Sequence, residues 1–315
     1  MGRFVARESP AMDALVADTI AKVGAEIGEL RIPKLQGVVL GGGYGRGEGG
    51  VLIDGADERL SNDLDFFAVT EAGVSSGELR AVAAALQPVS SAWTERLGID
   101  VDFVVRTPWR IRHDEERVMI QELVHGHVDV AGRPGKELFK DVAHRPPEAF
   151  PWTEAVRLLV NRGVGLTLAR ASADGMFAER NVNKCVLGAG DAVLIARHAY
   201  AWRVEDRAAA LGWPAYTAAM EWKFRPRRGG ACGWEDARRL WLEAVDEVRK
   251  IGRRQGDDGR SFYQAARWVV RRRTVGDLRT LGQGAVVRIL AKLARVVEER
   301  GTPPAALKKD WTVFN

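Results

Sequence analysis

The feature that most constrains the fold is a glycine-rich segment between two apolar stretches. Seven of the ten residues from Gly41 to Gly50 are glycine. The segment follows the apolar stretch Gly37 to Leu40 and precedes a second one, Leu64 to Val69. Glycine loses more conformational freedom on folding than any other residue, so this concentration needs a reason, and a close backbone approach to an anion is one. We expect a strand, a tight turn and a second strand.

Two aspartates introduce the second apolar stretch. Asp63 and Asp65 are one residue apart, and side chains alternate across a strand, so both should point to the same face. Two carboxylates on one face repel each other unless a cation lies between them. The pair next to a glycine turn therefore predicts a site for a metal ion and a phosphate.

Hydrophobic spacing predicts an α+β fold, layered as in α/β proteins, with a small mixed sheet. The expected strands are 37–41, 64–69, 99–105 and the edge strand 127–130, the expected helices are 10–29, 76–97 and 114–124, and 51–61 is expected to be an irregular insertion. After the proline-rich segment 145–151 the pattern becomes helical, with expected helices 153–171, 180–203, 235–254, 260–273 and 284–299. We expect a mixed-sheet domain over 1–148 and an all-helical domain over 149–315.

Charge is distributed unevenly along the chain, whose net charge is +5. Residues 1–150 hold 17 Lys/Arg and 24 Asp/Glu, whereas the remainder holds 30 and 18. An acidic half beside a basic half suits a metal site that faces an anionic ligand. Solvated basic helices are the alternative explanation.

The sequence disfavours three classes of protein: membrane-spanning, disulfide-rich and zinc-binding. No apolar run reaches the roughly 18 residues that cross a bilayer, and the N-terminal segment lacks an apolar signal core. The two cysteines, Cys185 and Cys232, do not make a disulfide framework, and no Cys/His cluster has zinc spacing. We expect a cytoplasmic protein.

The glycine segment alone has three interpretations. Gly45 to Gly50 formally matches the dinucleotide fingerprint G-x-G-x-x-G, but its strand ends five residues too early, at Leu40. A Walker A loop is excluded because no Gly-Lys-Ser/Thr follows. A flexible loop without a ligand is the second interpretation, and the third joins the turn to the downstream aspartates.

The third interpretation rests on a family resemblance. Gly42-Gly43-Tyr44-Gly45-Arg46-Gly47-Glu48, then Asp63-Leu64-Asp65, then Asp102 in Val101-Asp102-Phe103-Val104-Val105 resembles the signature of the polymerase-β-like nucleotidyltransferase superfamily. The resemblance covers residues 37–105. The gap between Gly43 and Asp63 is longer than in the family pattern, and Gly43 replaces the frequent serine. Neither departure removes a metal ligand.

The resemblance implies a magnesium-dependent reaction. Asp63 and Asp65 would bridge two Mg²⁺ ions, for which Mn²⁺ could substitute, and Asp102 would hold the catalytic ion and help to deprotonate the acceptor hydroxyl. Asp100 competes with Asp102 for this third role, because both lie on the same strand face. Two ions about 4 Å apart can activate the attacking oxygen and stabilise the leaving one.

The residues of the turn would hold the nucleoside triphosphate (NTP). The Gly42 and Gly43 amides would cradle its phosphates. Arg46 could pair with a phosphate, or form a salt bridge to Glu48 or Glu58. Tyr44 could stack on the base or simply cover the turn.

The helical half offers one further candidate group. Lys184, Gly188 and Asp191 follow at i, i+4 and i+7 on one helix face. Lys184 could neutralise a triphosphate and Asp191 could act on the acceptor. The alternative is tight helix packing at the glycine with a Lys–Asp pair on the surface.

These observations predict transfer of a nucleoside monophosphate (NMP) from an NTP to an acceptor hydroxyl or phosphate, with release of pyrophosphate. The acceptor is a small hydroxylated molecule or an RNA end, and a protein acceptor is not excluded. The clusters Lys223 to Arg228 and Arg271 to Arg273 could contact RNA phosphates or form a solvated basic face. A non-catalytic nucleotide-sensing or interaction module on the same fold is the alternative function.

Overall fold

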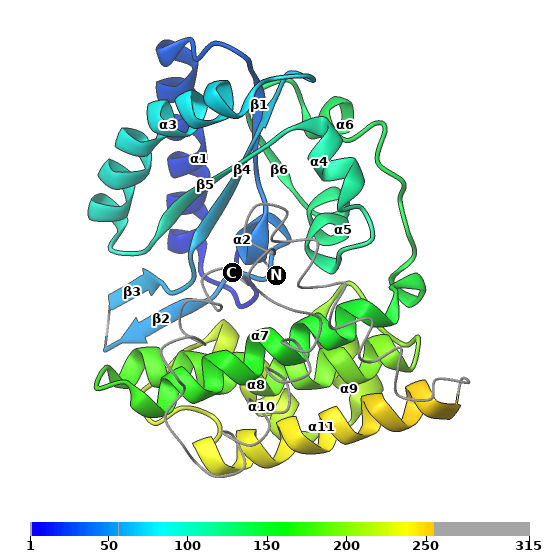
Figure 1. Cartoon of the computed structure of the whole chain (residues 1–315). Coiled ribbons are helices and arrows are strands. Elements are labelled where there is room, and N and C mark those ends of the chain that lie inside the picture. Colours follow the sequence, from blue (N-terminus) through cyan, green and yellow to red (C-terminus); the bar gives the residue numbers. More distant parts are fainter. Residues whose placement is uncertain (1, 56, 255–315) are drawn as a thin grey trace. The chain divides into compact units, whose positions relative to one another are not determined.

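The computed structural model describes residues 2–55 and 57–254, and the chain divides into two compact units (Figure 1). The first unit contains the chain up to Arg145 together with Phe224–Arg227. The second contains Pro146–Lys223 and the residues from Arg228 onward that the structure describes. An α+β fold with an N-terminal mixed sheet and a mostly helical C-terminal region is thus confirmed, while the roles predicted for 1–148 and 149–315 stay predictions.

The first unit is built on a four-stranded mixed sheet in the order β5-β4-β1-β6. Strand β1 (Leu35–Leu40) runs antiparallel to both β4 (Leu64–Thr70) and β6 (Val128–Gly132). Strand β5 (Val101–Arg106) runs parallel to β4. The parallel pair is joined through helix α3 (Ser76–Leu97), as a parallel crossover requires. The predicted edge strand at 127–130 is confirmed as β6.

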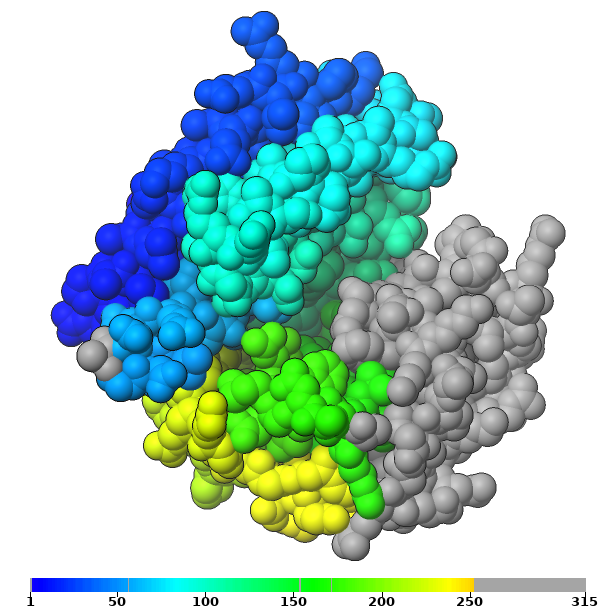
Figure 2. All heavy atoms as spheres, turned by 90° about the vertical axis from the view of Figure 1, so that its left-hand side faces the viewer, coloured from blue at the N-terminus to red at the C-terminus, as the bar shows by residue number. Residues whose placement is uncertain are grey.

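Helices cover both faces of this sheet and create two apolar cores. Helix α1 (Pro10–Leu30) and α3 pack on one face, and Figure 2 shows them side by side, α1 in blue and α3 in cyan. On the other face lie α4 (Pro108–His113), α5 (Val118–His125) and α6 (Gly135–Leu138). Side chains of β4 alternate between them: Phe66 belongs to the α1/α3 core and Phe67 to the α4/α5 core. This alternation decides the face on which each polar strand residue lies.

Two local predictions in the first unit were wrong. Residues 51–61 are not irregular but form an antiparallel hairpin of β2 (Val51–Asp54) and β3 (Asp57–Leu60), with Gly55 at a positive φ of 65° in the turn. The sequence signal was weak because the strands have only four residues each and half of their side chains are exposed. The helix predicted over 114–124 starts too early, because α5 begins only at Val118, and α4, which ends at His113, was not predicted. The glycine segment itself contains the short helix α2 (Gly42–Gly45).

The second unit is helical throughout the part that the structure describes. Its elements are the 3-10 turn Pro147–Ala149 and helices α7 (Trp152–Ala171), α8 (Gly175–Ala196), α9 (Val204–Leu211), α10 (Pro214–Phe224) and α11 (Trp234–Arg254). Helices α7, α8 and α11 pack together, and the buried Trp241 indole on α11 donates to the Leu159 carbonyl of α7 at 2.8 Å.

Predicted and observed helices differ in this unit where turns interrupt the pattern. The helix predicted over 180–203 is α8, which begins five residues earlier and ends at Ala196. Helices α9 and α10 were not predicted, because each is short. The helices predicted over 260–273 and 284–299 and the cluster Arg271 to Arg273 lie outside the described residues. Cys185 and Cys232 are both free thiols, and none of the helices in the described ranges is long and apolar enough to span a bilayer.

Candidate active site

The glycine turn is attached directly to the strand that carries Asp65. The Gly41 amide donates to the Asp65 carbonyl oxygen at 2.8 Å, which fixes the end of β1 against the start of β4. Gly42 has a φ of 62°, and a Cβ placed on it would lie only 2.2 Å from Asp65 Oδ2. Both the left-handed backbone and the missing side chain are therefore required here. The Asp65 carboxylate rests against the turn.

Three carboxylates lie on one face at the same edge of the sheet. Asp65 and Asp102 are paired in the parallel register of β4 and β5. Each is two residues from a side chain of the α4/α5 core, Phe67 and Val104 respectively, so both lie on that face. Asp63 precedes β4 by one residue and has the same parity. The parallel strands begin where β1 ends, so the carboxylates and the glycine turn share one edge.

The electrostatic environment of Asp102 reflects this crowding. Burial raises the pKa of the Asp102 carboxyl, and the negative charges of Asp100 and Asp63 raise it further. Asp100 lies just before β5, and its carbonyl oxygen accepts the Leu64 amide at 2.9 Å. Asp102, which lies opposite Asp65, is the better placed of the two for the third carboxylate role, although that role stays a prediction.

The donor set suits a hard divalent cation. Carboxylate oxygens are the ligands that Mg²⁺ prefers, and it is usually held by one or two of them plus substrate phosphates. Asp63, Asp65 and Asp102 supply such oxygens on one face. Within the described ranges, no three His, Cys, Asp or Glu side chains already converge as a metal-binding group. By donor chemistry these residues fit Mg²⁺, and binding would draw together groups that now repel each other.

Tyr44 holds the glycine turn to the segment that precedes Asp63. Its side chain is fully buried, and its hydroxyl donates to the Gly50 carbonyl at 2.7 Å and accepts the amides of Ser61 (3.1 Å) and Asn62 (3.4 Å). The Asn62 side-chain oxygen accepts the Gly50 amide at 2.7 Å, which closes the same loop. Burial raises the pKa of the Tyr44 hydroxyl to about 12. Of the two predicted roles, this geometry matches covering the turn and leaves no ring face for stacking on a base.

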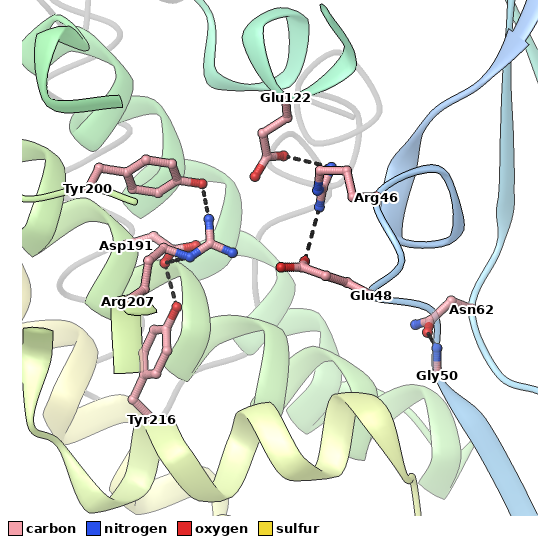
Figure 3. Close-up of polar contacts among 9 residues, drawn as sticks. All are labelled: Arg46, Glu48, Gly50, Asn62, Glu122, Asp191, Tyr200, Arg207 and Tyr216. Atoms are coloured by element: carbon pink, nitrogen blue, oxygen red, sulfur yellow. Dashed lines mark hydrogen bonds and ion pairs between the residues drawn. The ribbon is translucent and has the colours of Figure 1, made fainter. Parts of the chain in front are cut away.

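Arg46 is clamped by two glutamates (Figure 3). Its Nη1 lies 3.1 Å from Glu122 Oε2 on α5, and its Nη2 lies 3.5 Å from Glu48 Oε2. The three side chains are 14%, 15% and 8% exposed respectively, so this is a largely buried cluster rather than a surface pair. The predicted salt bridge to Glu48 is present, whereas Glu58 instead accepts a hydrogen bond from the Ser9 hydroxyl. Arg46 would have to exchange these partners to contact a phosphate.

Glu122 and His125 are neighbours of the turn that the sequence did not reveal. Both lie on α5, and burial lowers the pKa of His125, with His144 and Arg46 lowering it further. They are more than 70 residues from the turn in sequence, and no local spacing connects them to it. Only the packing of α5 on the sheet brings them there.

In the second unit, the predicted Lys184–Gly188–Asp191 stripe does lie on one helix, α8. A Cβ on Gly188 would lie 2.4 Å from Arg162 Cγ, and one on Gly190 would lie 2.4 Å from the Tyr216 ring. Both glycines therefore allow neighbouring helices to pack closely, which was the alternative to a ligand site. Lys184 is half-buried on this helix.

Asp191 belongs to a polar cluster within the second unit (Figure 3). Its Oδ1 accepts a hydrogen bond from the Tyr216 hydroxyl at 2.6 Å and lies 3.3 Å from Arg207 Nε. The Arg207 side chain is only 4% exposed and also donates to the Tyr200 hydroxyl. The Asp191 carboxylate is therefore part of a largely buried cluster. They give Asp191 a structural role in holding α8 to α9 and α10, and its predicted part in catalysis stays a prediction.

Comparison of the sequence with models of known protein families finds no family that matches, and comparison with curated proteins finds no relative.

Proposed function

We propose that this protein is a Mg²⁺-dependent nucleotidyltransferase, with Mn²⁺ as the alternative ion. One observation supports this above all: Asp63, Asp65 and Asp102 share one face and one sheet edge with a glycine turn that rests against the Asp65 carboxylate. Carboxylates that repel each other beside a phosphate-sized turn are suited to a cation and a polyphosphate together.

Different residues of the chain would bind the nucleotide, hold the metal ion and accept the proton of the acceptor. The first amides of a helix have no intrahelical acceptor, so Gly42 and Gly43 can donate to phosphate oxygens. Asp63, Asp65 and Asp102 would hold Mg²⁺, which when bound supplies Lewis-acid polarisation of the phosphate. Asp102 would also accept the proton of the acceptor hydroxyl, the role that the family resemblance implies for it.

The reaction is a substitution at the α-phosphorus of the NTP. The acceptor oxygen forms a bond to that phosphorus, the bond to the oxygen bridging to the β-phosphate breaks, and pyrophosphate leaves. The proton of the acceptor hydroxyl passes to the Asp102 carboxylate. Arg46 and Lys184 are further candidates for contacting the triphosphate, and Asp191 for acting on the acceptor.

The acceptor is a small hydroxylated molecule or an RNA end, with a protein as a third class. The excess of Lys and Arg after residue 150 supports an anionic acceptor. Lys223 to Arg228 contribute to this excess, and Arg225, Arg227 and Arg228 are exposed.

A labelling experiment tests the proposal. The full chain is incubated with each α-labelled NTP, Mg²⁺ and a cell extract divided into RNA, protein and small molecules. We expect label in one fraction, and we expect Asp65→Asn to abolish it. Asp18→Asn is the matched control, because Asp18 is exposed on α1 and pairs with Lys22 at the surface. Equal labelling by wild type and Asp65→Asn would contradict the proposal.

A non-catalytic nucleotide sensor is the second candidate. The glycine turn beside the Asp65 carboxylate would serve nucleotide binding with or without a transfer reaction. Tight Mg²⁺-dependent NTP binding without label transfer to any fraction would support the sensor over the enzyme.

A further inference from the structure

The opposite end of strand β5 carries a cation on the same sheet face as Asp102. Arg106 is the last residue of β5 and lies four residues after Asp102, so the two share a face. At about 3.3 Å per residue their Cα atoms are about 13 Å apart. Arg106 is therefore separate from the candidate active site and lies on the side covered by α4 and α5.

Arg110 on helix α4 and Arg117, which precedes α5, flank one buried acid that follows α4. Thr107 caps the helix by accepting the Arg110 amide at 3.0 Å. The Asp114 carboxylate, 3% exposed, lies 3.2 Å from Arg110 Nε and 3.2 Å from Arg117 Nη2. The Arg117 side chain is itself only 6% exposed. One carboxylate is therefore already shared by two guanidinium groups.

Arg106 has no such acid partner. Its guanidinium donates to the Val105 carbonyl at 3.3 Å, and no carboxylate within residues 2–55 and 57–254 is at ion-pair distance from it. Burial lowers the pKa of Arg106 and the positive charge of Arg110 lowers it further, whereas the negative charge of Asp114 raises it in part. A half-buried guanidinium beside a second one is costly unless an anion compensates it.

The neighbouring glutamates do not compensate the positive charge of the arginines at this end of β5. Residues 106–117 contain four arginines and three acidic residues. The two acids other than Asp114, namely Glu115 and Glu116, lie 3.5 Å and 3.7 Å from Arg145. Positive charge thus collects at this end of a unit whose sequence is acidic overall.

We propose that Arg106 and Arg110 form a binding site for a phosphate-type oxyanion, separate from the carboxylate edge. A guanidinium group presents a planar fork of donors that matches a phosphate bidentately. Arg117 and Asp114 position Arg110, and Arg106 adds a third positive charge beside the single Asp114 carboxylate. The anion is either free phosphate or the phosphate group of a small metabolite, which share this chemistry.

Calorimetric titration of the full chain with inorganic phosphate tests the site. EDTA is present throughout, so that no metal ion can bind phosphate at the carboxylates. We expect millimolar or tighter binding that weakens at least about tenfold in Arg106→Gln, as the loss of a charge-assisted hydrogen bond implies. Arg112→Gln is the matched control, because Arg112 is an exposed arginine of the same helix, and it should change the affinity less than about twofold. A second titration uses glycerol phosphate in place of inorganic phosphate. Whichever of the two binds more tightly shows whether the site suits free phosphate or the phosphate group of a small metabolite.

Two further variants keep the outcome decisive. Arg106→Lys keeps the charge but loses the fork, so it should fold and bind phosphate more weakly than wild type. Asp63→Asn should bind phosphate as wild type does, whether or not the proposed transferase activity exists. Unchanged affinity in Arg106→Gln or Arg106→Lys, loss of binding in Asp63→Asn, or no binding to wild type would overturn the proposal.

Discussion

Asp65 and Asp102 are direct partners in the parallel register of β4 and β5, and both lie on the α4/α5 face of the sheet. This relationship joins residues 37 positions apart and places two carboxylates at the strand starts, next to the end of β1. The glycine turn then completes the edge, because a Cβ on Gly42 would collide with the Asp65 carboxylate. Much of the functional argument depends on this pairing.

Substitution of the two turn glycines by alanine should have unequal effects. Gly42 has a positive φ and would place Cβ 2.2 Å from Asp65 Oδ2, whereas the nearest atom to a Cβ on Gly43 would be the Glu48 carbonyl oxygen, at 3.3 Å. We expect Gly42→Ala to lose roughly 1–3 kcal/mol of stability from backbone strain and displacement of Asp65, and to lose nucleotide binding. Gly43→Ala, its matched control, should fold with a much smaller loss. Denaturant unfolding measures both, and equal losses would contradict the geometry.

Asp102→Asn should stabilise the metal-free protein at neutral pH. Because the pKa of Asp102 is raised in the folded state, the stability that its neutral form contributes is present below the unfolded pKa and is lost as pH rises through the folded pKa. The asparagine variant does not suffer this loss. In EDTA, the thermal unfolding midpoint of the variant should therefore be higher than that of wild type at pH 7. The difference between the two midpoints should be smaller at pH 3. A variant that is less stable than wild type at pH 7 would show that Asp102 is not under repulsion.

Tyr44→Phe should remove the stability that wild type loses when the Tyr44 hydroxyl ionises at alkaline pH. The folded pKa of about 12 exceeds the unfolded value of about 10, so the contribution is complete below pH 10 and disappears as pH rises toward 12. Two pKa units correspond to at most roughly 2–3 kcal/mol. The variant should also be less stable at pH 7 by about 1–3 kcal/mol, because the Gly50 carbonyl and the Ser61 and Asn62 amides lose their partner. The stability difference between wild type and variant, followed by urea unfolding, should shrink between pH 10 and 12, and a constant difference would contradict this.

Asp191→Asn separates a structural role from a catalytic one. Removing the charge leaves the buried Arg207 guanidinium without this carboxylate, and breaking one partner of such a pair costs about 3–5 kcal/mol. Tyr216→Phe removes only the hydroxyl that donates to Asp191 and should cost about 1 kcal/mol. Denaturant unfolding with kinetic assays of both variants is the measurement. A stable Asp191→Asn protein that has lost transferase activity would instead assign Asp191 to the chemistry.

Glu122→Gln should loosen the clamp on Arg46. Glu122 is the nearer of its two glutamate partners, and the pair is largely buried. We expect a loss of about 1–3 kcal/mol, with a smaller loss for Glu48→Gln, whose oxygen lies farther from Arg46. A double-mutant cycle with Arg46→Gln measures the coupling for each glutamate. Equal coupling energies would show that the two contacts are equivalent.

The sequence was sufficient for features that depend on local spacing. Helices α1 and α3, the strands on either side of the glycine segment and the shared parity of Asp63 and Asp65 all follow from periodicity over a few residues. The hairpin of β2 and β3 was missed because four-residue strands carry little alternation. Helices α9 and α10 were missed because they are short.

Contacts between distant segments could not be predicted in the same way. Nothing in the local pattern places Asp65 opposite Asp102, buries the whole Tyr44 side chain, or sets Glu122 of α5 against Arg46. The same holds for Tyr216 and Arg207, which surround Asp191 from two helices that the pattern did not reveal. These relationships depend on register and packing, and they changed the interpretation of Tyr44, Arg46 and Asp191.

The central claim is that the edge formed by Asp63, Asp65, Asp102 and the glycine turn holds a metal ion and a triphosphate together. Calorimetric titration with a non-hydrolysable NTP, with Mg²⁺ or with EDTA, tests it most directly. The account predicts binding that requires Mg²⁺ and is lost in Asp63→Asn and Asp65→Asn but kept in Asp18→Asn. Binding of equal affinity in EDTA, or binding unchanged by both aspartate substitutions, would contradict it.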